Sequence, residues 1–116
     1  MKDVLIINSD TEFFRNFAEY LGMFYGIENV VTTADKGSAV QILKTAPFDL
    51  VILDLGMSGA DAVLDDLRRN HPKVPVMVMA NEGMDKAMTR FKDRNVRPFL
   101  HMPRDIHGMA QQILEA

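Results

Sequence analysis

The sequence has no cysteine and no tryptophan among its 116 residues. Without cysteine the chain can form no disulfide, no thiolate zinc site and no redox-active thiol. Its 13 Lys and Arg residues are outnumbered by 16 Asp and Glu residues, and the two signs are interspersed. There is no basic stripe of the kind that binds nucleic acid, and the pI of about 5.5 argues further against direct nucleic-acid binding.

Long apolar runs are lacking as well. No segment approaches the about 20 apolar residues that span a bilayer. The first residues form a strand-like run rather than a signal peptide. The composition, 47% hydrophobic and 25% charged, is ordinary for a soluble globule. We therefore expect a cytoplasmic protein without membrane contact, folded as a single domain over residues 1–116.

The sequence does contain a regular alternation of short apolar runs and helical patterns. The runs are rich in Val, Ile and Leu, and three are near-continuous, as in strands covered on both faces. We expect strands over residues 4–7, 30–32, 50–53, 74–79 and 98–102. Five strands alternating with five helices predict an α/β fold with a doubly wound, five-stranded parallel sheet of strand order 2-1-3-4-5.

The helical patterns place apolar residues on one face at intervals of three and four. The first helix is expected to open with a capping box from Ser9 to Glu12 and to bury a face that includes Phe24. The third is expected to open with a similar box from Ser58 to Asp61. The other helices are expected around residues 39–46, 84–91 and 106–114.

Ligands of such sheets bind at the carboxyl ends of strands where the winding direction reverses, here between the first and third strands. Asn8 and Ser9 follow the first strand, and Asp54 ends the third. Flavin binding is not expected, because residues 8–14 include no glycine and hold two acids that would repel a phosphate.

The sequence around these ends resembles bacterial response-regulator receiver domains. The resemblance covers the whole chain and rests on five blocks, VLIINSD (4–10), ADKG (34–37), DLVILDLGMSGAD (49–61), VPVMVMA (74–80) and FLHMP (99–103). It implies a flavodoxin-like receiver fold and a role in two-component signal transduction.

Receivers share five active positions, and this sequence matches one of them. The resemblance makes Asp54 the candidate phospho-acceptor. The two acids that hold Mg²⁺ in receivers correspond to Asn8 and Ser9, which are neutral. The hydroxyl residue that senses the phosphate corresponds to Ala80, and the lysine that neutralises it corresponds to Met102.

Each replacement removes part of the phosphotransfer chemistry. Mg²⁺ takes oxygen ligands, usually with one or two carboxylates, and the remaining candidates are Asp54, the carbonyl of Gly56 and Asp10, which is better explained as a helix cap. Without the ion the transferring phosphoryl group lacks its charge clamp. Met102 offers no cation and Ala80 no hydroxyl. The sequence thus predicts a pseudo-receiver with no catalysis and no cofactor.

We expect this pseudo-receiver to bind another signalling protein, whether a kinase, an output domain or another regulator, independently of phosphorylation. One alternative is a receiver still phosphorylated on Asp54 by a histidine kinase, and only this alternative leaves room for Mg²⁺. Another is a small-molecule sensor that uses the crevice beside Ala80, unless Met102 fills it.

The resemblance also implies a partner face, because receivers contact their partners through the fourth helix, the fifth strand and the fifth helix. The corresponding candidates here are Met84, Arg90, Phe91, Phe99, Arg104 and His107. The sequence ends directly after the last expected helix. We therefore expect a domain that acts in trans or belongs to a longer protein.

Overall fold

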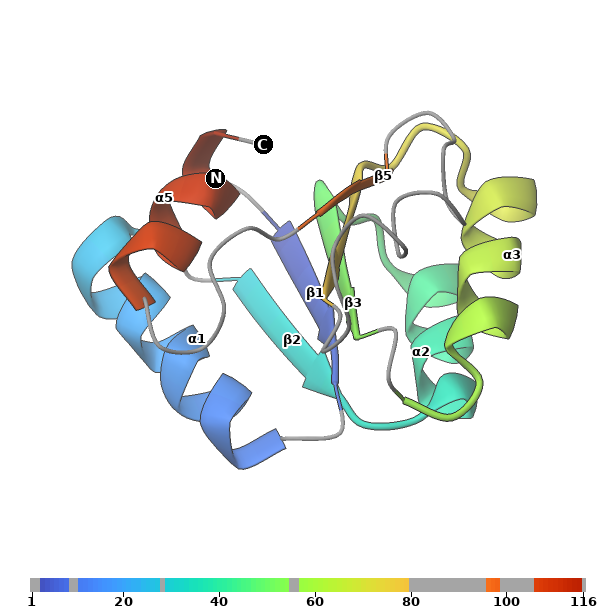
Figure 1. The fold of residues 1–116 in the computed structure, drawn as a ribbon, viewed down its shortest axis with the longest axis horizontal. Helices are drawn as coiled ribbons and strands as arrows, with labels where there is room; N and C mark the ends of the chain where they lie inside the picture. The colour runs from blue at the N-terminus through green and yellow to red at the C-terminus, as the bar shows by residue number, and fades with distance from the viewer. Residues whose placement is uncertain are drawn as a thin grey trace.

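A parallel five-stranded sheet forms the centre of the protein in the computed structural model (Figure 1). The structure describes residues 3–8, 11–27, 29–54, 57–79, 96–98 and 106–115. The strands are β1 (Asp3–Ile7), β2 (Asn29–Thr33), β3 (Leu50–Asp54), β4 (Val76–Met79) and β5 (Val96–Pro98). Their order, β2-β1-β3-β4-β5, confirms the predicted doubly wound sheet.

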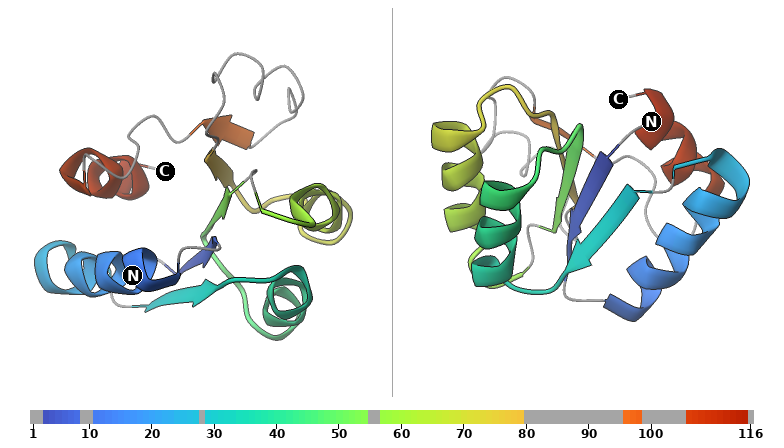
Figure 2. Two further views of the ribbon diagram at one scale, coloured as in Figure 1. Left: turned by 60° about the horizontal axis from the view of Figure 1, so that its bottom comes forward. Right: turned by 180° about the vertical axis from the view of Figure 1, so that it is seen from behind.

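Helices cover both faces of the sheet. The described helices are α1 (Thr11–Tyr25), α2 (Lys36–Thr45), α3 (Ala60–Asn70) and α5 (Ile106–Glu115). Figure 2 shows α1 and α5 together on one face and α2 and α3 on the other. The fourth expected helix, over residues 84–91, lies outside the described residues. None of the described helices has the length and apolar character needed to cross a membrane.

The near-continuous apolar strands are explained by this two-sided cover. Successive side chains of a strand point to opposite faces, so β1 sends Leu5 and Ile7 toward α2 and α3, and Val4 and Ile6 toward α1 and α5. All four side chains are fully buried. The sheet therefore separates two hydrophobic cores, one on each face. Each buried side chain of this size contributes about 1.5–3 kcal/mol of hydrophobic free energy.

The strand bounds differ from the sequence-based expectation at the far edge of the sheet. β4 begins at Val76 rather than at residue 74, and β5 occupies Val96–Pro98, two residues before the expected start at residue 98. The rest of that expected strand, residues 99–102, lies outside the described residues.

The expectation that Phe24 is buried on the inner face of α1 was wrong. Phe14, Phe17 and Leu21 bury the inner face of α1, but Phe24 is 66% exposed. The chain turns at Gly26, whose φ is 70°, and the N–H of Ile27 donates to the carbonyl of Leu21 at 3.1 Å. Ile27 therefore enters the core under the helix end in place of Phe24.

The expected capping box at the start of α3 is also absent. The N-cap is Gly59, with φ 84° and no side-chain cap bond, and Ser58 is exposed. The N–H of Met57 donates to the carbonyl of Asp54, and that of Ala60 to the carbonyl of Met57, each at 3.3 Å. Because these bonds and the burial of Met57 fix the turn, the helix starts at Ala60.

Candidate functional site

The carboxyl edge of the sheet brings together the ends of β1, β2 and β3. Ile7 pairs with Leu53 across β1 and β3, so the next residues along each strand, Asn8 and Asp54, lie beside each other. On its other side Asp54 pairs with Met79 of β4. A half-buried carboxylate thus ends the central strand between a neutral amide residue and an apolar one.

Asn8 is held firmly at this edge. It is only 9% exposed, and its backbone N–H donates to the carbonyl of Thr33 at 3.0 Å. Asn8 therefore occupies an interior position, where a second carboxylate beside Asp54 would face both desolvation and repulsion unless a cation were bound. An uncharged side chain at this place avoids both costs.

Thr33 is a residue of this edge that the sequence-based reasoning did not single out. It ends β2, pairs with Ile7, and is 8% exposed, one of two buried polar residues among those described. Its position could have been found from the parallel register, because the residue in line with the end of β1 must also reach the carboxyl edge.

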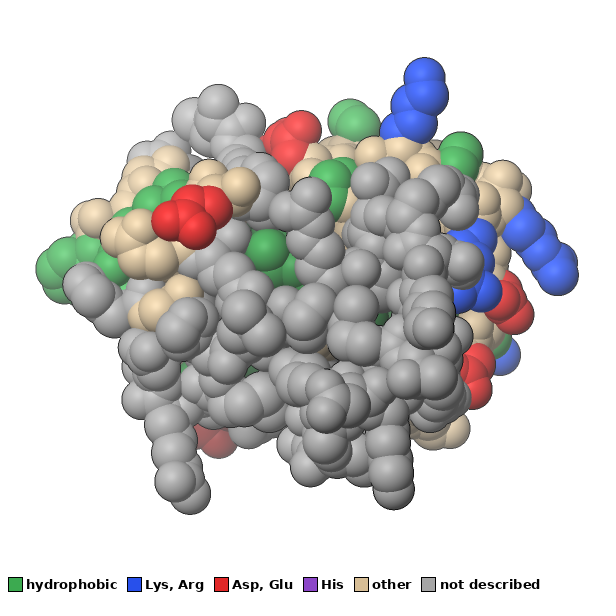
Figure 3. Space-filling model, turned by 45° about the horizontal axis from the view of Figure 1, so that its top comes forward, with side chains coloured by type: hydrophobic (Ala, Val, Ile, Leu, Met, Phe, Trp, Pro, Cys, Tyr) green, Lys and Arg blue, Asp and Glu red, His purple; other side chains and the backbone are tan. Residues whose placement is uncertain are grey.

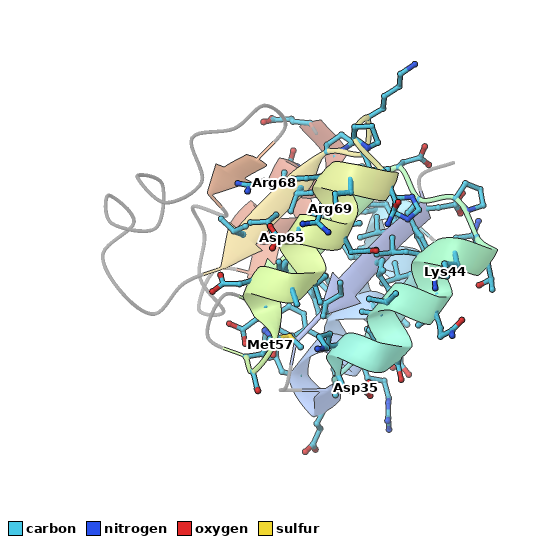
Figure 4. The ribbon with its side chains drawn as sticks, turned by 90° about the vertical axis from the view of Figure 1, so that its right-hand side faces the viewer. Asp35, Lys44, Met57, Asp65, Arg68 and Arg69 are labelled. Carbon is cyan, nitrogen blue, oxygen red and sulfur yellow. The ribbon has the colours of Figure 1, made fainter. Side chains whose placement is uncertain are left out.

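Lys36 is a second such residue. It begins α2 directly after the N-cap Asp35, and a Cβ placed on Gly59 would lie 3.0 and 3.2 Å from carbons of the Lys36 side chain. The aliphatic part of Lys36 thus lies against Gly59 at the start of α3. Figure 4 labels Asp35 and Met57 near the starts of α2 and α3, at this same end of the molecule.

The remaining candidates from the sequence fall largely outside the described residues. The expected pocket residues that are not described are Ser9, Asp10, Gly56, Ala80 and Met102. The residues of the expected partner face that are not described are Met84, Arg90, Phe91, Phe99 and Arg104. His107 lies in the first turn of α5, and its side chain is likewise outside the description. The structure therefore brings together Asn8 and Asp54 alone from the expected site.

The two described residues are a poor donor set for Mg²⁺. A hard divalent ion is held by carboxylates and waters, and this pair offers one carboxylate and one neutral amide. Among the residues that the structure describes, no three His, Cys, Asp or Glu side chains are grouped closely enough to hold a metal ion.

A shallow groove of about 380 Å³ lies between α2 and α3. It is lined by Lys36, Val40, Ala62, Asp65, Asp66, Arg69 and Asn70. Asp65 and Arg68 form an ion pair at 3.8 Å, and the side-chain amide of Asn70 donates to Asp66 at 2.8 Å. Figure 4 shows Asp65, Arg68 and Arg69 along α3. Because the groove is open and carries both acidic and basic side chains, its lining favours neither anionic nor cationic ligands.

Comparison with known proteins identifies one family. The family model of the response regulator receiver domain matches residues 4–114. A search of curated protein sequences gives no match.

Solved structures share the fold at low sequence identity. The phosphorylated cyanobacterial phytochrome response regulator RcpA is 18% identical, with a TM-score of 0.78 over 98% of this chain and 91% of that one. Response regulator TrrA from Thermotoga maritima, solved with Mg²⁺ and beryllofluoride, is 16% identical, with a TM-score of 0.79 over 99% and 98%. The apo receiver domain of nitrogen regulatory protein C is 21% identical, with a TM-score of 0.79 over 98% and 92%.

Proposed function

The chain belongs to the response regulator receiver domain family of two-component signalling, and from this premise we propose that it is a pseudo-receiver that binds a signalling partner independently of phosphorylation. In this proposal residues 1–116 act as one cytoplasmic domain without catalysis. The partner is a kinase, an output domain or another regulator.

One observation carries the proposal, the neutral and buried Asn8 beside Asp54. In a phosphorylated receiver the acids at the end of the first strand hold the ion that neutralises the incoming phosphoryl group. Here the described neighbour of the candidate acceptor cannot supply that charge. Since positioning and charge stabilisation provide nearly all of the catalysis in phosphoryl transfer, the usual Mg²⁺-dependent route is disfavoured.

The residues at the other pocket positions also support the loss of phosphotransfer. Ser9 takes the place of the second acid, Ala80 that of the hydroxyl residue and Met102 that of the lysine. Even a phosphoryl group that reached Asp54 would find no hydroxyl at residue 80 and no cation at residue 102. The proposal therefore assigns Asp54 no chemical step.

The test is amide NMR of the whole chain, first with Mg²⁺ and then with added beryllofluoride, which mimics an acyl phosphate. We expect the resonances of Asn8, Asp54 and Met79 to stay in place through both additions. Asp54→Asn should give the same result as the wild type. Asp61→Asn, which removes an exposed carboxylate at the start of α3, is the matched control for a simple loss of charge.

A pocket that still accepts a phosphoryl group would give a different NMR result. Shifts that begin at Asp54, extend to β4 and β5 and disappear in Asp54→Asn would mean that the pocket still accepts a phosphoryl group. Hydroxylamine-sensitive labelling of Asp54 by a small phosphodonor would establish the same point chemically. The alternative, a receiver phosphorylated by a histidine kinase, would then replace this proposal.

A further inference from the structure

The end of the molecule opposite Asp54 exposes large apolar side chains. Met23 is 75% exposed and Phe24 66% exposed, in the last turn of α1, and Leu114 is 41% exposed in the last turn of α5. α1 and α5 lie next to each other on one face of the sheet and end at the same side of the molecule (Figure 1). We call these three side chains the α1–α5 end surface.

Ring contacts connect the end surface to the core beneath it. The rings of Phe24 and Tyr20 lie 5.1 Å apart and those of Tyr20 and Tyr25 5.6 Å apart, and this cluster continues to the buried Phe17. Removal from water, followed by the hydrogen bond with Tyr20, raises the pKa of Tyr25 above its usual value. The buried Ile27 fixes the end of the helix beneath them.

Among the described residues, the charged side chains nearest the end surface are acidic. Neither α1 nor α5 has a basic residue in its last turn, where a cation would normally offset the negative end of the helix dipole. Glu19, one turn before Met23, and Glu115, next to Leu114, are both exposed. The described cation of α1, Arg15, precedes Met23 by eight residues, about 12 Å along the helix.

Figure 3 views this end of the molecule obliquely. Hydrophobic and acidic side chains are seen over α1 and α5 at the left, whereas the coloured Lys and Arg side chains all lie toward the right. The basic residues there belong to α2, α3 and the segment that follows α3. Among the described side chains, the acidic ones beside the end surface are Glu19 and Glu115, which we call its negative rim, and the basic ones lie farther away.

We propose that the α1–α5 end surface is a docking site for an amphipathic helix of a partner protein, whose apolar face is flanked by Lys and Arg. Exposed apolar residues that cluster on adjoining elements mark interaction sites more often than scattered ones do. The negative rim selects a basic partner and disfavours a second copy of this chain, which would present the same negative rim. The proposal rests on the proposed function only in assuming that the protein binds a partner.

The test uses two synthetic amphipathic helices of about four turns, one built of Leu and Lys and the other of Leu and Glu. Each is titrated into the whole chain and followed by amide NMR. The Leu–Lys helix should shift amides in the last two turns of α1 and α5, far from Asp54. The Leu–Glu helix should bind at least about tenfold more weakly, because its charges repel the rim.

Substitutions in the end surface test which side chains bind the Leu–Lys helix. Met23→Ser combined with Phe24→Ser should raise the Kd for the Leu–Lys helix about tenfold, and Leu114→Ser on the other helix should raise it several-fold. Glu19→Lys combined with Glu115→Lys should weaken binding about fivefold, as expected for rim charges. Val31→Ser, which changes an exposed apolar residue of β2, is the matched control and should leave the Kd unchanged.

Three results would overturn the docking site: equal affinity for both peptides, shifts away from the ends of α1 and α5, or an unchanged Kd in both serine variants. A concentration-dependent dimer in sedimentation that Met23→Ser and Phe24→Ser abolish would instead assign the surface to a second copy. None of these measurements involves Mg²⁺, beryllofluoride or Asp54, so the docking site and the pseudo-receiver proposal can fail separately.

Discussion

At the scale of single residues, Gly59 has a backbone conformation that a residue with a Cβ rarely adopts. Its φ of 84° lies in the left-handed region, and an added Cβ would lie 3.0 Å from the Lys36 side chain. The outer part of the Lys36 side chain can move, but its Cβ would lie 3.2 Å from the added atom, and no movement of Lys36 removes the strain of the left-handed backbone. The start of α3 therefore depends on glycine at this position.

We predict that Gly59→Ala destabilises the protein by about 1–2 kcal/mol, the cost of a left-handed conformation for a residue with a Cβ. Gly37→Ala is the matched control. Gly37 lies in the first turn of α2, and an added Cβ would make only ordinary contact with Asp35 at 3.5 Å. This change should be neutral or stabilising by up to about 1 kcal/mol. Urea unfolding of both variants measures the two effects, and equal effects would contradict the assignment.

At the scale of elements, the start of α2 illustrates how a local pattern fixes a helix. The Asp35 carboxylate accepts hydrogen bonds from the N–H of Ser38 at 2.8 Å and from its hydroxyl at 3.0 Å. These bonds, the backbone bond first, hold the pKa of Asp35 below its ordinary value of 3.8. The same residue thus caps the helix and favours its own ionised form.

A pH dependence of stability follows from this cap. Since the folded pKa is below the unfolded one, the carboxylate's contribution is fully present above the unfolded value of about 3.8. It is lost as the pH falls through the lower folded pKa. We predict that Asp35→Ala loses stability at pH 7 but differs less from the wild type in strong acid.

Asp35→Asn is the control, because it retains a capping side chain without a titrating group. Urea unfolding between pH 2 and 7 compares the three proteins. If the difference between wild type and Asp35→Ala did not shrink as the pH falls, ionisation of Asp35 would not be the source of the stabilisation.

At the scale of the whole molecule, stability is expected to vary across the sheet. β1 and β3 are central and their inward residues are fully buried, whereas β2 forms one edge. The carbonyl of Thr33 accepts a bond from Asn8 of β1. Because alternate residues of a strand point their backbone groups to opposite sides, the N–H groups of Val30 and Thr32 point away from β1.

We predict that the amides of Val30 and Thr32 exchange with solvent through local fluctuations. The amides of Ile6 and Ile52, in the central strands, should exchange only through global unfolding. Hydrogen exchange of the whole chain, read by NMR across a urea series, separates these cases. Protection of Thr32 equal to that of Ile52 would contradict the edge position of β2.

Much of the fold was predictable from the sequence because its signals are local. The apolar runs that become β1 and β3 are nearly continuous, which a strand requires when both of its faces are buried. Alternation of strands with helices then limits the topology to a few right-handed arrangements, and the predicted order was confirmed. The place of Asp54 at the end of β3 follows from the same pattern.

Other features depended on contacts between distant segments. Apolar periodicity assigns Phe24 to the inner face of α1, but the turn at Gly26 brings Ile27 under the helix end and leaves Phe24 exposed. The start of α3 is set by the burial of Met57 and by backbone bonds to Asp54, which outweigh the capping pattern at Ser58.

The sequence alone was enough to predict the strands of the sheet, apart from the bounds of β4 and β5, because hydrophobic periodicity is a local property of the chain. The strand order followed from the alternation of strands with helices, and the resemblance to receiver domains made Asp54 the candidate acceptor. Only the tertiary structure decided that Asn8 is buried beside Asp54, that Thr33 reaches the same edge, and that Met23 and Phe24 remain exposed. The physical reason is that burial depends on which segments cover a residue, and such neighbours are far apart in the sequence.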